Sequence, residues 1–283
     1  MENDFCSSII SSGASAYISS TDKKTALKSY QVWEDGELRA YFGEDCENEL
    51  AREAFIYKML DEHPNILACH GLEEIHHNVN ALRMEYAPLG DVRKYIRQHK
   101  ETPLSIQIRL RMALDTAAGL SHMHSKNIQY CDMSCRNLLL FPGYRVKLAD
   151  FGGSCVEGHE LYGKPGIYEE MPYELPLRGR KELGDRPARK RELFALGSAI
   201  YEMMAWVKPC EGMTEDEIEA RYAAEEFPDV DEIIARDIIQ GCWDERYESA
   251  DEVAQLLERL IASRSKSDGE VEGDQDVNGN ETH

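Results

Sequence analysis

Near residue 87, the spacing of apolar residues changes from short segments to long helical ones. Before this point, short apolar segments typical of strands alternate with polar turns, and residues 48–60 have the 3.6-residue rhythm of an amphipathic helix. The predicted strands are 14–19, 25–30 and 80–86, and the predicted helices of the second part are 92–99, 105–124, 189–206, 233–242 and 249–261. The sequence therefore predicts an α+β fold in which a small sheet-rich lobe precedes a larger, mostly helical lobe.

These patterns divide the chain into an N-lobe, residues 1–86, a C-lobe, residues 87–262, and a tail, residues 263–283. The tail has no aromatic residue and is rich in Ser, Gly, Asp, Glu and Asn. Such a segment cannot bury enough apolar surface to offset the entropy that it loses on ordering. We therefore predict that it is an acidic, disordered tail.

The chain has 32 Lys and Arg against 53 Asp and Glu, which gives a formal charge of −21. Nucleic acids and anionic membranes would repel such a chain, so we expect neither as a partner. The charges are uneven, since residues 178–191 carry seven cations and two acids, while residues 215–232 carry nine acids and one cation. Two interpretations of residues 178–191 stay open: a solvated loop, or a surface that recognises an acidic or phosphorylated protein.

The eight cysteines are scattered, without the paired spacing of a zinc site or a redox motif. The N-terminus is acidic, unlike a secretory signal, and the most apolar long segment, residues 193–207, is too short to span a bilayer. We therefore expect a reducing compartment, the cytoplasm or the nucleus.

Residues 130–152 combine carboxylate and amide side chains with two apolar strands. Asp132 precedes Asn137 by five residues, and the apolar residues 138–140 follow directly. A second apolar segment, residues 146–149, leads into Asp150, which begins the tripeptide D-F-G. Phosphoryl transfer needs cations against phosphate, oxygen ligands for magnesium and a carboxylate that orients the attacking hydroxyl. This segment contains the oxygen ligands and the carboxylate.

The arrangement resembles the D-x-x-x-x-N catalytic loop and the D-F-G of the eukaryotic-type protein kinases. By this resemblance, Asp132 is the catalytic base, and Asn137 and Asp150 are the magnesium ligands. Lys28 ends a segment similar to the family's V-A-I-K and would contact the nucleotide phosphates, with Glu53 as its ion-pair partner. The resemblance covers residues 10–260 and is nearest to the small, divergent kinase-like proteins common in fungi.

The resemblance also implies an ATP site, with Mg²⁺, at the junction of the two lobes. Met84 resembles the family's gatekeeper, after which backbone groups of Glu85 and Ala87 would bind the adenine edge. The residues expected to bind the nucleotide are Gly13, Ile18, Ala26, Lys28, Glu85, Ala87 and Leu139.

The chain departs from the family pattern at four places. Gly13 is the one glycine that remains of the phosphate-covering loop. Tyr130 and Cys131 replace the His-Arg before the catalytic Asp. The arginine that engages a phosphorylated activation segment is therefore missing. Tyr130 can still pack under the Phe of D-F-G. Ser134 replaces a lysine typical of Ser/Thr kinases. Arg136 stands where tyrosine kinases have an arginine, and would either face the γ-phosphate or position the loop.

Beyond the catalytic loop, residues 171–174 resemble the family's A-P-E. Glu192 stands where the central helix of the large lobe usually begins with Asp. Arg246 resembles the arginine that pairs with the A-P-E glutamate, here Glu174, and such a pair would tie the activation segment to the large lobe.

The sequence thus favours an enzyme: an ATP-dependent protein kinase that transfers the γ-phosphate to a protein hydroxyl, Ser or Thr rather than Tyr. Two alternatives stay open, a pseudokinase that acts as a nucleotide-binding or scaffolding module and a kinase-fold enzyme that phosphorylates a small molecule. We expect a monomer whose partner is a protein substrate, with an acidic substrate as one hypothesis. Because the loop arginine is missing, we also expect activity that does not depend on activation-segment phosphorylation.

Overall fold

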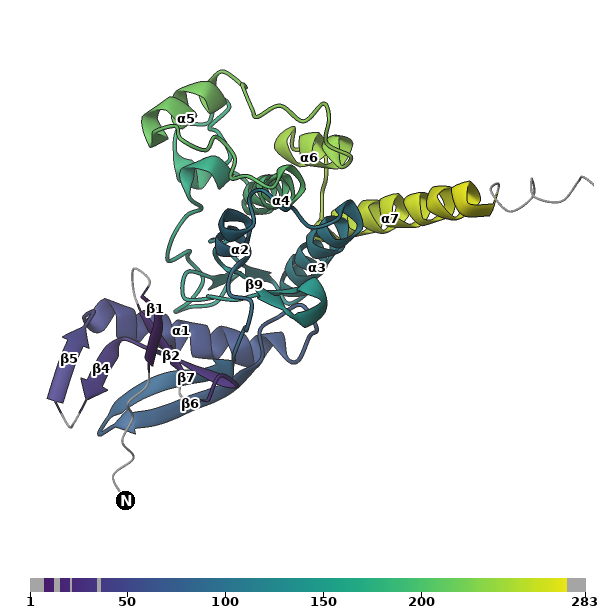
Figure 1. Ribbon diagram of the computed structural model, residues 1–283. Coiled ribbons are helices and arrows are strands. Elements are labelled where there is room, and N and C mark those ends of the chain that lie inside the picture. Colours follow the sequence, from purple (N-terminus) through teal and green to yellow (C-terminus); the bar gives the residue numbers. More distant parts are fainter. Residues whose placement is uncertain (1–7, 13–15, 21, 35–36, 274–283) are drawn as a thin grey trace, which may run out of the picture.

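The structure is a computed structural model that describes residues 8–12, 16–20, 22–34 and 37–273. A sheet-rich part with one helix precedes a mostly helical part (Figure 1). The mixed α+β architecture predicted from the sequence is confirmed. No helix in the described ranges is long and apolar enough to cross a membrane.

The N-terminal part is an antiparallel sheet with strand order β1-β2-β3-β7-β6, accompanied by a separate hairpin and one helix. Its elements are β1 (Ser8–Ser12), β2 (Tyr17–Ser20), β3 (Thr25–Ser29), β4 (Gln31–Glu34), β5 (Glu37–Tyr41), α1 (Glu44–Leu60), β6 (Cys69–His76) and β7 (Val79–Glu85). The three strands predicted here correspond to β2, β3 and β7. The strands β1, β4, β5 and β6 were not predicted. In β5, four of the five residues are exposed, which removes the apolar alternation that marks a strand.

The register of β3 and β7 positions Lys28 on the buried face of the sheet. Ala26 and Lys28 are buried and two residues apart, so they share one face of β3. Helix α1 packs over this face, because Glu53 contacts Lys28 and Tyr57, one turn later, donates to the Met84 sulfur at 3.7 Å.

The C-terminal part is a set of helices around the buried helix α4, in which every residue from Arg191 to Met204 is buried. The helices are α2 (Val92–Gln98), α3 (Ile106–Ser125), α4 (Ala188–Ala205), α5 (Glu215–Ala223), α6 (Arg236–Trp243) and α7 (Ala250–Gly273). The short strands are β8 (Ile128–Gln129), β9 (Leu138–Phe141), β10 (Arg145–Leu148) and β11 (Cys155–Val156). One continuous apolar core extends through both parts.

The hairpin β9–β10 joins the two parts. Bridges connect Leu148 to Ile66 and Leu139 to Asp91, where the chain enters α2. On the other side, Asp115 of α3 accepts hydrogen bonds from the Val146 amide at 3.0 Å and from the neighbouring arginine guanidinium. The hairpin therefore holds the catalytic-loop region and the following D-F-G between the two parts.

One helix was not predicted, and another is longer than predicted. Residues 215–223, the first part of the acidic stretch 215–232, form helix α5, which begins with a capping box between Thr214 and Glu217, and acids in a first turn favour a helix. Helix α7 continues to Gly273, so residues 263–273 of the predicted disordered tail are helical. A helix packed along its first turns extends at low cost, because propagation is much easier than nucleation. Residues 274–283 lie outside the described part.

Candidate active site

The centre of the site is a cluster of three charged side chains from β3, α1 and the D-F-G. Lys28 Nζ lies 2.6 Å from Glu53 Oε2 and 2.7 Å from Asp150 Oδ1. Glu53 Oε1 also accepts a hydrogen bond from the Phe151 amide at 3.2 Å. The ion pair expected between Lys28 and Glu53 is thus present, and it also fixes the conformation of the D-F-G.

Burial by itself lowers the pKa of the Lys28 ammonium and raises the pKa of the Asp150 carboxyl group, because it disfavours both charges. The Lys28 side chain is 9% exposed and that of Glu53 is 1% exposed, while that of Asp150 is 45% exposed. Burial works against the Lys28 ammonium, but the Asp150 and Glu53 carboxylates outweigh it and raise the pKa of Lys28 above its ordinary value. Burial is the largest influence on the Asp150 carboxylate and opposes its charge, yet the charge and hydrogen bond of Lys28, the Gly152 amide and the charge of Arg136 together outweigh burial and lower the pKa of Asp150. Lys28 and Asp150 therefore keep their charges at neutral pH.

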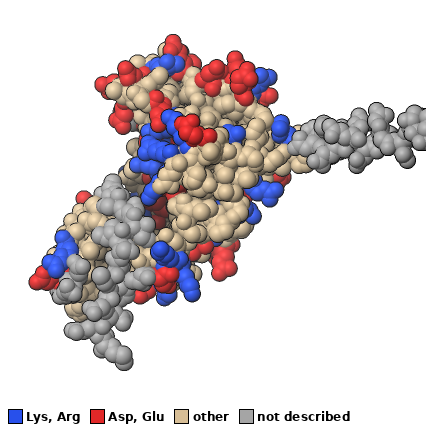
Figure 2. Space-filling view, in the orientation of Figure 1, with Lys and Arg blue, Asp and Glu red and all other residues tan. Residues whose placement is uncertain are grey.

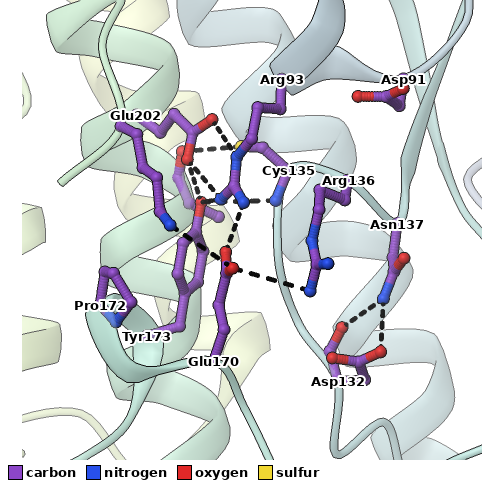
Figure 3. Close-up of polar contacts among 12 residues, drawn as sticks. Asp91, Arg93, Asp132, Cys135, Arg136, Asn137, Glu170, Pro172, Tyr173 and Glu202 are labelled. Carbon is purple, nitrogen blue, oxygen red and sulfur yellow. Dashed lines mark hydrogen bonds and ion pairs between the residues drawn. The ribbon is translucent and has the colours of Figure 1, made fainter. Parts of the chain in front are cut away.

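Asp132 and Asn137 meet in the catalytic loop, where Figure 3 shows them side by side. Asn137 Nδ2 donates to Asp132 Oδ2 at 2.8 Å and to the Asp132 carbonyl at 2.9 Å. Because the amide nitrogen is used in this way, Asn137 Oδ1 is the atom that stays available as an oxygen ligand. Burial, followed by the charge of Asp150, raises the pKa of Asp132 to about 6.

Glu192 fixes the backbone of this loop. Its Oε1 accepts hydrogen bonds from the Cys131 amide at 3.0 Å and from the Tyr130 amide, and its Oε2 lies 2.7 Å from His124 Nε2. The loop is held in an unusual conformation, since Cys131 has a φ of 67°. The Glu that replaces the family's usual Asp thus reaches two backbone donors of the loop.

The two replacements before Asp132 pack into the core. The Tyr130 ring lies 5.5 Å from the Phe151 ring, as expected, and its hydroxyl donates to the Asn137 carbonyl at 3.1 Å. Cys131 is buried, with its Sγ 3.8 Å from Cys155 Sγ on β11. Cys131 therefore fills space against the activation segment, residues 150–174, where the family has a cation.

The residues expected around the nucleotide lie on the strands that meet at the junction of the two parts. Ala26 is the cross-strand neighbour of Met84, and Leu139 lies on β9. The Glu85 amide donates to the Ala68 carbonyl at 3.0 Å, and the Glu85 carboxylate accepts from the Ala68 amide and from Lys147. Ile18 on β2 pairs with Lys28, and Gly13 lies outside the described residues.

The segment after Met84 has one backbone group suited to a ligand. The Ala87 carbonyl accepts from the Gly90 amide at 3.2 Å, while the Ala87 amide has no acceptor in the described part of the chain. This amide is a free donor at the place where the adenine edge is expected.

Figure 3 shows the Arg136 guanidinium between Asp132 and Glu170, with a dashed line that joins it to Glu170. Its Nη2 lies 3.6 Å from Glu170 Oε2, and Lys208 Nζ lies at the same distance from that oxygen. Arg93 Nη1 approaches Glu170 Oε1 to 2.5 Å. Sequence reasoning missed Glu170, because nothing in the spacing distinguishes it from neighbouring glutamates.

The predicted pair between Glu174 and Arg246 is wrong. Glu174 Oε1 lies 3.2 Å from Arg186 Nη1, whose side chain is fully buried, while Arg246 pairs with Asp244 at 3.4 Å. The Arg246 amide closes the end of α6 on the Gly241 carbonyl, and its side chain is 53% exposed. A second buried pair, between Glu169 and Arg191 of α4, also holds the activation segment.

Residues 178–191 are partly exposed, as at positions 181, 182, 184 and 185, but several of their cations are paired within the chain. Arg178 lies 2.6 Å from Glu225 and 2.9 Å from Glu245, and Arg180 lies 2.9 Å from Glu245. Lys190 pairs with Glu248 at 2.6 Å. Acids of the large lobe, one of them from the acidic residues 215–232, therefore neutralise much of this stretch.

A magnesium site fits the donor set of the centre. Mg²⁺ takes oxygen ligands and is commonly held by one or two carboxylates together with substrate phosphates and waters. Asp150 and Asn137 Oδ1 are such donors. In the described residues, no group of three or more His, Cys, Asp or Glu side chains is placed to hold a metal ion.

Comparison with known proteins identifies the family. A model of the protein kinase domain matches residues 10–267. The chain belongs to the protein kinase family. Its members are phosphotransferases that bind ATP, and the resemblance seen in the sequence is confirmed at this level.

Individual relatives are distant and of mixed specificity. The chain is 32% identical over 170 residues to serine/threonine/tyrosine-protein kinase HT1 of Arabidopsis thaliana, a match that covers 57% of this chain and 41% of the relative. It is 28% identical over 232 residues to tyrosine-protein kinase Fer of Rattus norvegicus, covering 79% and 28%. It is 26% identical over 231 residues to serine/threonine-protein kinase LMTK3 of Mus musculus, covering 73% and 16%. The matches thus span less than half of these relatives.

Proposed function

We propose that this kinase domain is catalytically active and transfers the γ-phosphate of ATP, bound with Mg²⁺, to a hydroxyl of a protein substrate. The observation that carries the proposal is the contact of Lys28 with both Glu53 and Asp150. Glu53 also accepts a hydrogen bond from the Phe151 amide and so holds the D-F-G. In protein kinases the strand lysine, the helix glutamate and the D-F-G aspartate must all be in position for transfer. The contacts among Lys28, Glu53 and Asp150 support such an arrangement in this chain.

Each residue has a separate role in this proposal. Lys28 would pair with the α- and β-phosphates, and Asp150 and Asn137 would hold Mg²⁺, which neutralises phosphate charge. Asp132, oriented by Asn137, would accept the proton of the attacking hydroxyl. With a pKa of about 6, Asp132 is ionised at neutral pH and yet basic enough to take that proton.

We further propose a Ser or Thr acceptor, action as a monomer and a reducing compartment, the cytoplasm or the nucleus. The described cysteines are all free thiols, which fits such a compartment. Peptides that are identical except for Ser, Thr or Tyr at the acceptor position test the acceptor directly. Equal or faster transfer to Tyr would overturn this part of the proposal.

The decisive experiment compares the wild type with Asp132→Asn in the presence of Mg²⁺ and labelled ATP. Transfer to the protein itself or to generic substrates, lost in the variant, supports an active kinase. Absence of transfer in both, with a nucleotide-dependent rise in melting temperature, would instead show a nucleotide-binding pseudokinase.

A further inference from the structure

We propose that a cationic pocket between α2 and the end of α4 binds an anionic side chain, a carboxylate or a phosphoryl group, of the protein substrate. This inference deepens the proposed function, because it rests on a protein being the substrate. It moves the acidic-substrate hypothesis away from residues 178–191, whose cations are largely neutralised within the chain.

The pocket has a volume of about 170 Å³. Its lining residues are Arg93, Ile96, Arg97, Lys100, Glu202, Trp206, Lys208 and Glu211. Figure 2 shows blue side chains gathered where α2 lies in Figure 1, with red side chains beside them. The apolar floor and the basic rim are the combination that binds a charged side chain together with its stem.

The cations of the pocket differ in how far they are neutralised. Arg93 is buried and pairs with Glu202, with Nε–Oε1 and Nη2–Oε2 distances of 2.8 Å, while its Nη1 faces Glu170. Arg97 and Lys100 are exposed, and neither takes part in an ion pair within the described chain. Together with Lys208 they outnumber Glu211, the remaining acid of the lining. The pocket therefore offers net positive charge to a ligand.

The structure already shows a carboxylate at one edge of this pocket. Glu170, from the activation segment, is approached by Arg93 at 2.5 Å and by Lys208 and Arg136 at 3.6 Å each (Figure 3). These three cations come from three different segments, so the fold itself brings them together around an anion. Arg93 and Lys208 also line the pocket, so Glu170 shows that its cations bind a carboxylate.

A chain of contacts links the pocket to the catalytic loop. Arg93 and Lys208 of the lining contact Glu170, and Glu170 contacts Arg136. Arg136 is adjacent to Asn137, which contacts Asp132 at 2.8 Å. A peptide that presents its hydroxyl to Asp132 would therefore extend past Arg136 toward Lys208 and α2. An anionic residue at that point would strengthen binding and leave the chemical step unchanged.

Binding of labelled peptides to full-length Asp132→Asn protein, followed by fluorescence anisotropy, tests the inference without catalysis. The peptides share one acceptor and differ at flanking positions, which carry Glu, phosphoserine, Ala or Lys. We expect the Glu or the phosphoserine peptide to bind about tenfold more tightly than the Ala peptide, because charge-assisted hydrogen bonds are strong. The stronger of the two identifies the carboxylate or the phosphoryl group as the preferred anion.

Two variants in the same background locate the effect. Arg97→Glu/Lys100→Glu should abolish the preference for anionic peptides and favour the Lys peptide, with little change in melting temperature because both side chains are exposed. Arg180→Ala, which removes a cation paired with Glu245, should leave the preference unchanged. Equal affinity for all peptides, or a preference that survives Arg97→Glu/Lys100→Glu, would overturn the inference.

The same peptides separate this inference from the proposed function. If the anionic preference is present but the wild type transfers phosphate to no peptide, the proposed catalytic function fails while the pocket stands. If transfer occurs with equal KM for Glu, phosphoserine and Ala peptides, the catalytic function stands while the pocket fails.

Discussion

The catalytic centre and the activation segment meet at the D-F-G, but they follow the family pattern to different degrees. In the centre, Lys28, Glu53 and Asp150 occupy the places that the resemblance assigned to them, and they are in contact. In the activation segment, Glu174 pairs with Arg186 instead of the expected partner, and Glu170 forms contacts that the pattern did not predict.

The difference reflects what each region must do. Groups that face phosphate, magnesium and a reacting hydroxyl are restricted to a few residue types at fixed spacing. Holding a loop against a helix requires complementary charge and burial, which many different pairs can supply. Ion-pair partners can therefore change in the segment while the centre keeps its composition.

The largest expected effect comes from the centre. Asp132→Asn removes the proposed base and should lower kcat by about 10²–10⁴-fold. Nucleotide binding should be retained, and the melting temperature should not fall, because burial disfavours the Asp132 charge. Steady-state kinetics and thermal unfolding check both parts. A variant with nearly normal kcat would remove Asp132 from the reaction.

Among the helices that hold the activation segment, the largest effect should be on stability. Arg93 of α2 contacts Glu170 of that segment, and Arg93→Leu leaves Glu202 of α4 buried without its bidentate partner, which typically costs about 3–5 kcal/mol. Urea unfolding measures this loss. The double variant Arg93→Leu/Glu202→Leu should recover much of it, since no buried charge is then unpaired. A single variant that costs under about 1 kcal/mol would show that the pair is not buried in solution.

The pH dependence of kcat/KM tests the environment of Asp132. A base must be ionised, and the pKa of Asp132 is raised to about 6, so kcat/KM should fall about tenfold per unit below that pH. The residual activity of Asp132→Asn should lack this decrease of kcat/KM at low pH. The comparison thus separates the titration of Asp132 from that of the nucleotide, which would affect both proteins. A decrease near pH 4 would instead indicate a carboxylate exposed to water.

These contrasts also show what the sequence could predict. Lys28 and Glu53 stand within a strand and a helix pattern, so their contact could be predicted in advance, although their roles stay predictions. The hydrogen bond from Asn137 to Asp132 was not predicted, because the resemblance assigned these residues only separate roles. The partner of Glu174 could not, because several arginines are chemically equivalent and the fold decides which of them is buried near it. The strand β5 could not be predicted either, because four of its five residues are exposed and its sequence therefore has no apolar alternation.

A smaller effect is expected at the paired surface of residues 178–191. Arg180→Ala removes a contact of 2.9 Å to Glu245 at a side chain that is 25% exposed, so the free energy of unfolding should fall by about 1 kcal/mol or less. Urea unfolding at low and high salt checks this, because salt should weaken the effect further. A much larger loss would place this pair among the buried ones.

The smallest effect is expected from dephosphorylation. The activation segment is held by the buried pair of Glu169 with Arg191 and by the contact of Glu170 with Arg93. Cys131 offers no cation to a phosphate group at the position of the family's arginine. Treating the purified active protein with phosphatase should therefore leave its activity unchanged. A large loss, accompanied by a mapped phosphorylated residue in the segment, would contradict this expectation.

The Lys28 cluster has a consequence for the order in which ligands enter the site. One ammonium stands against the carboxyl groups of Glu53, Asp150 and Asp132, and burial raises the pKa of Glu53 and of Asp132. The acidic groups still outnumber the cation, and such an excess attracts a divalent cation and repels bare triphosphate. The nucleotide is therefore expected to enter as its metal complex, and chelation of divalent cations should weaken its binding before any chemistry occurs.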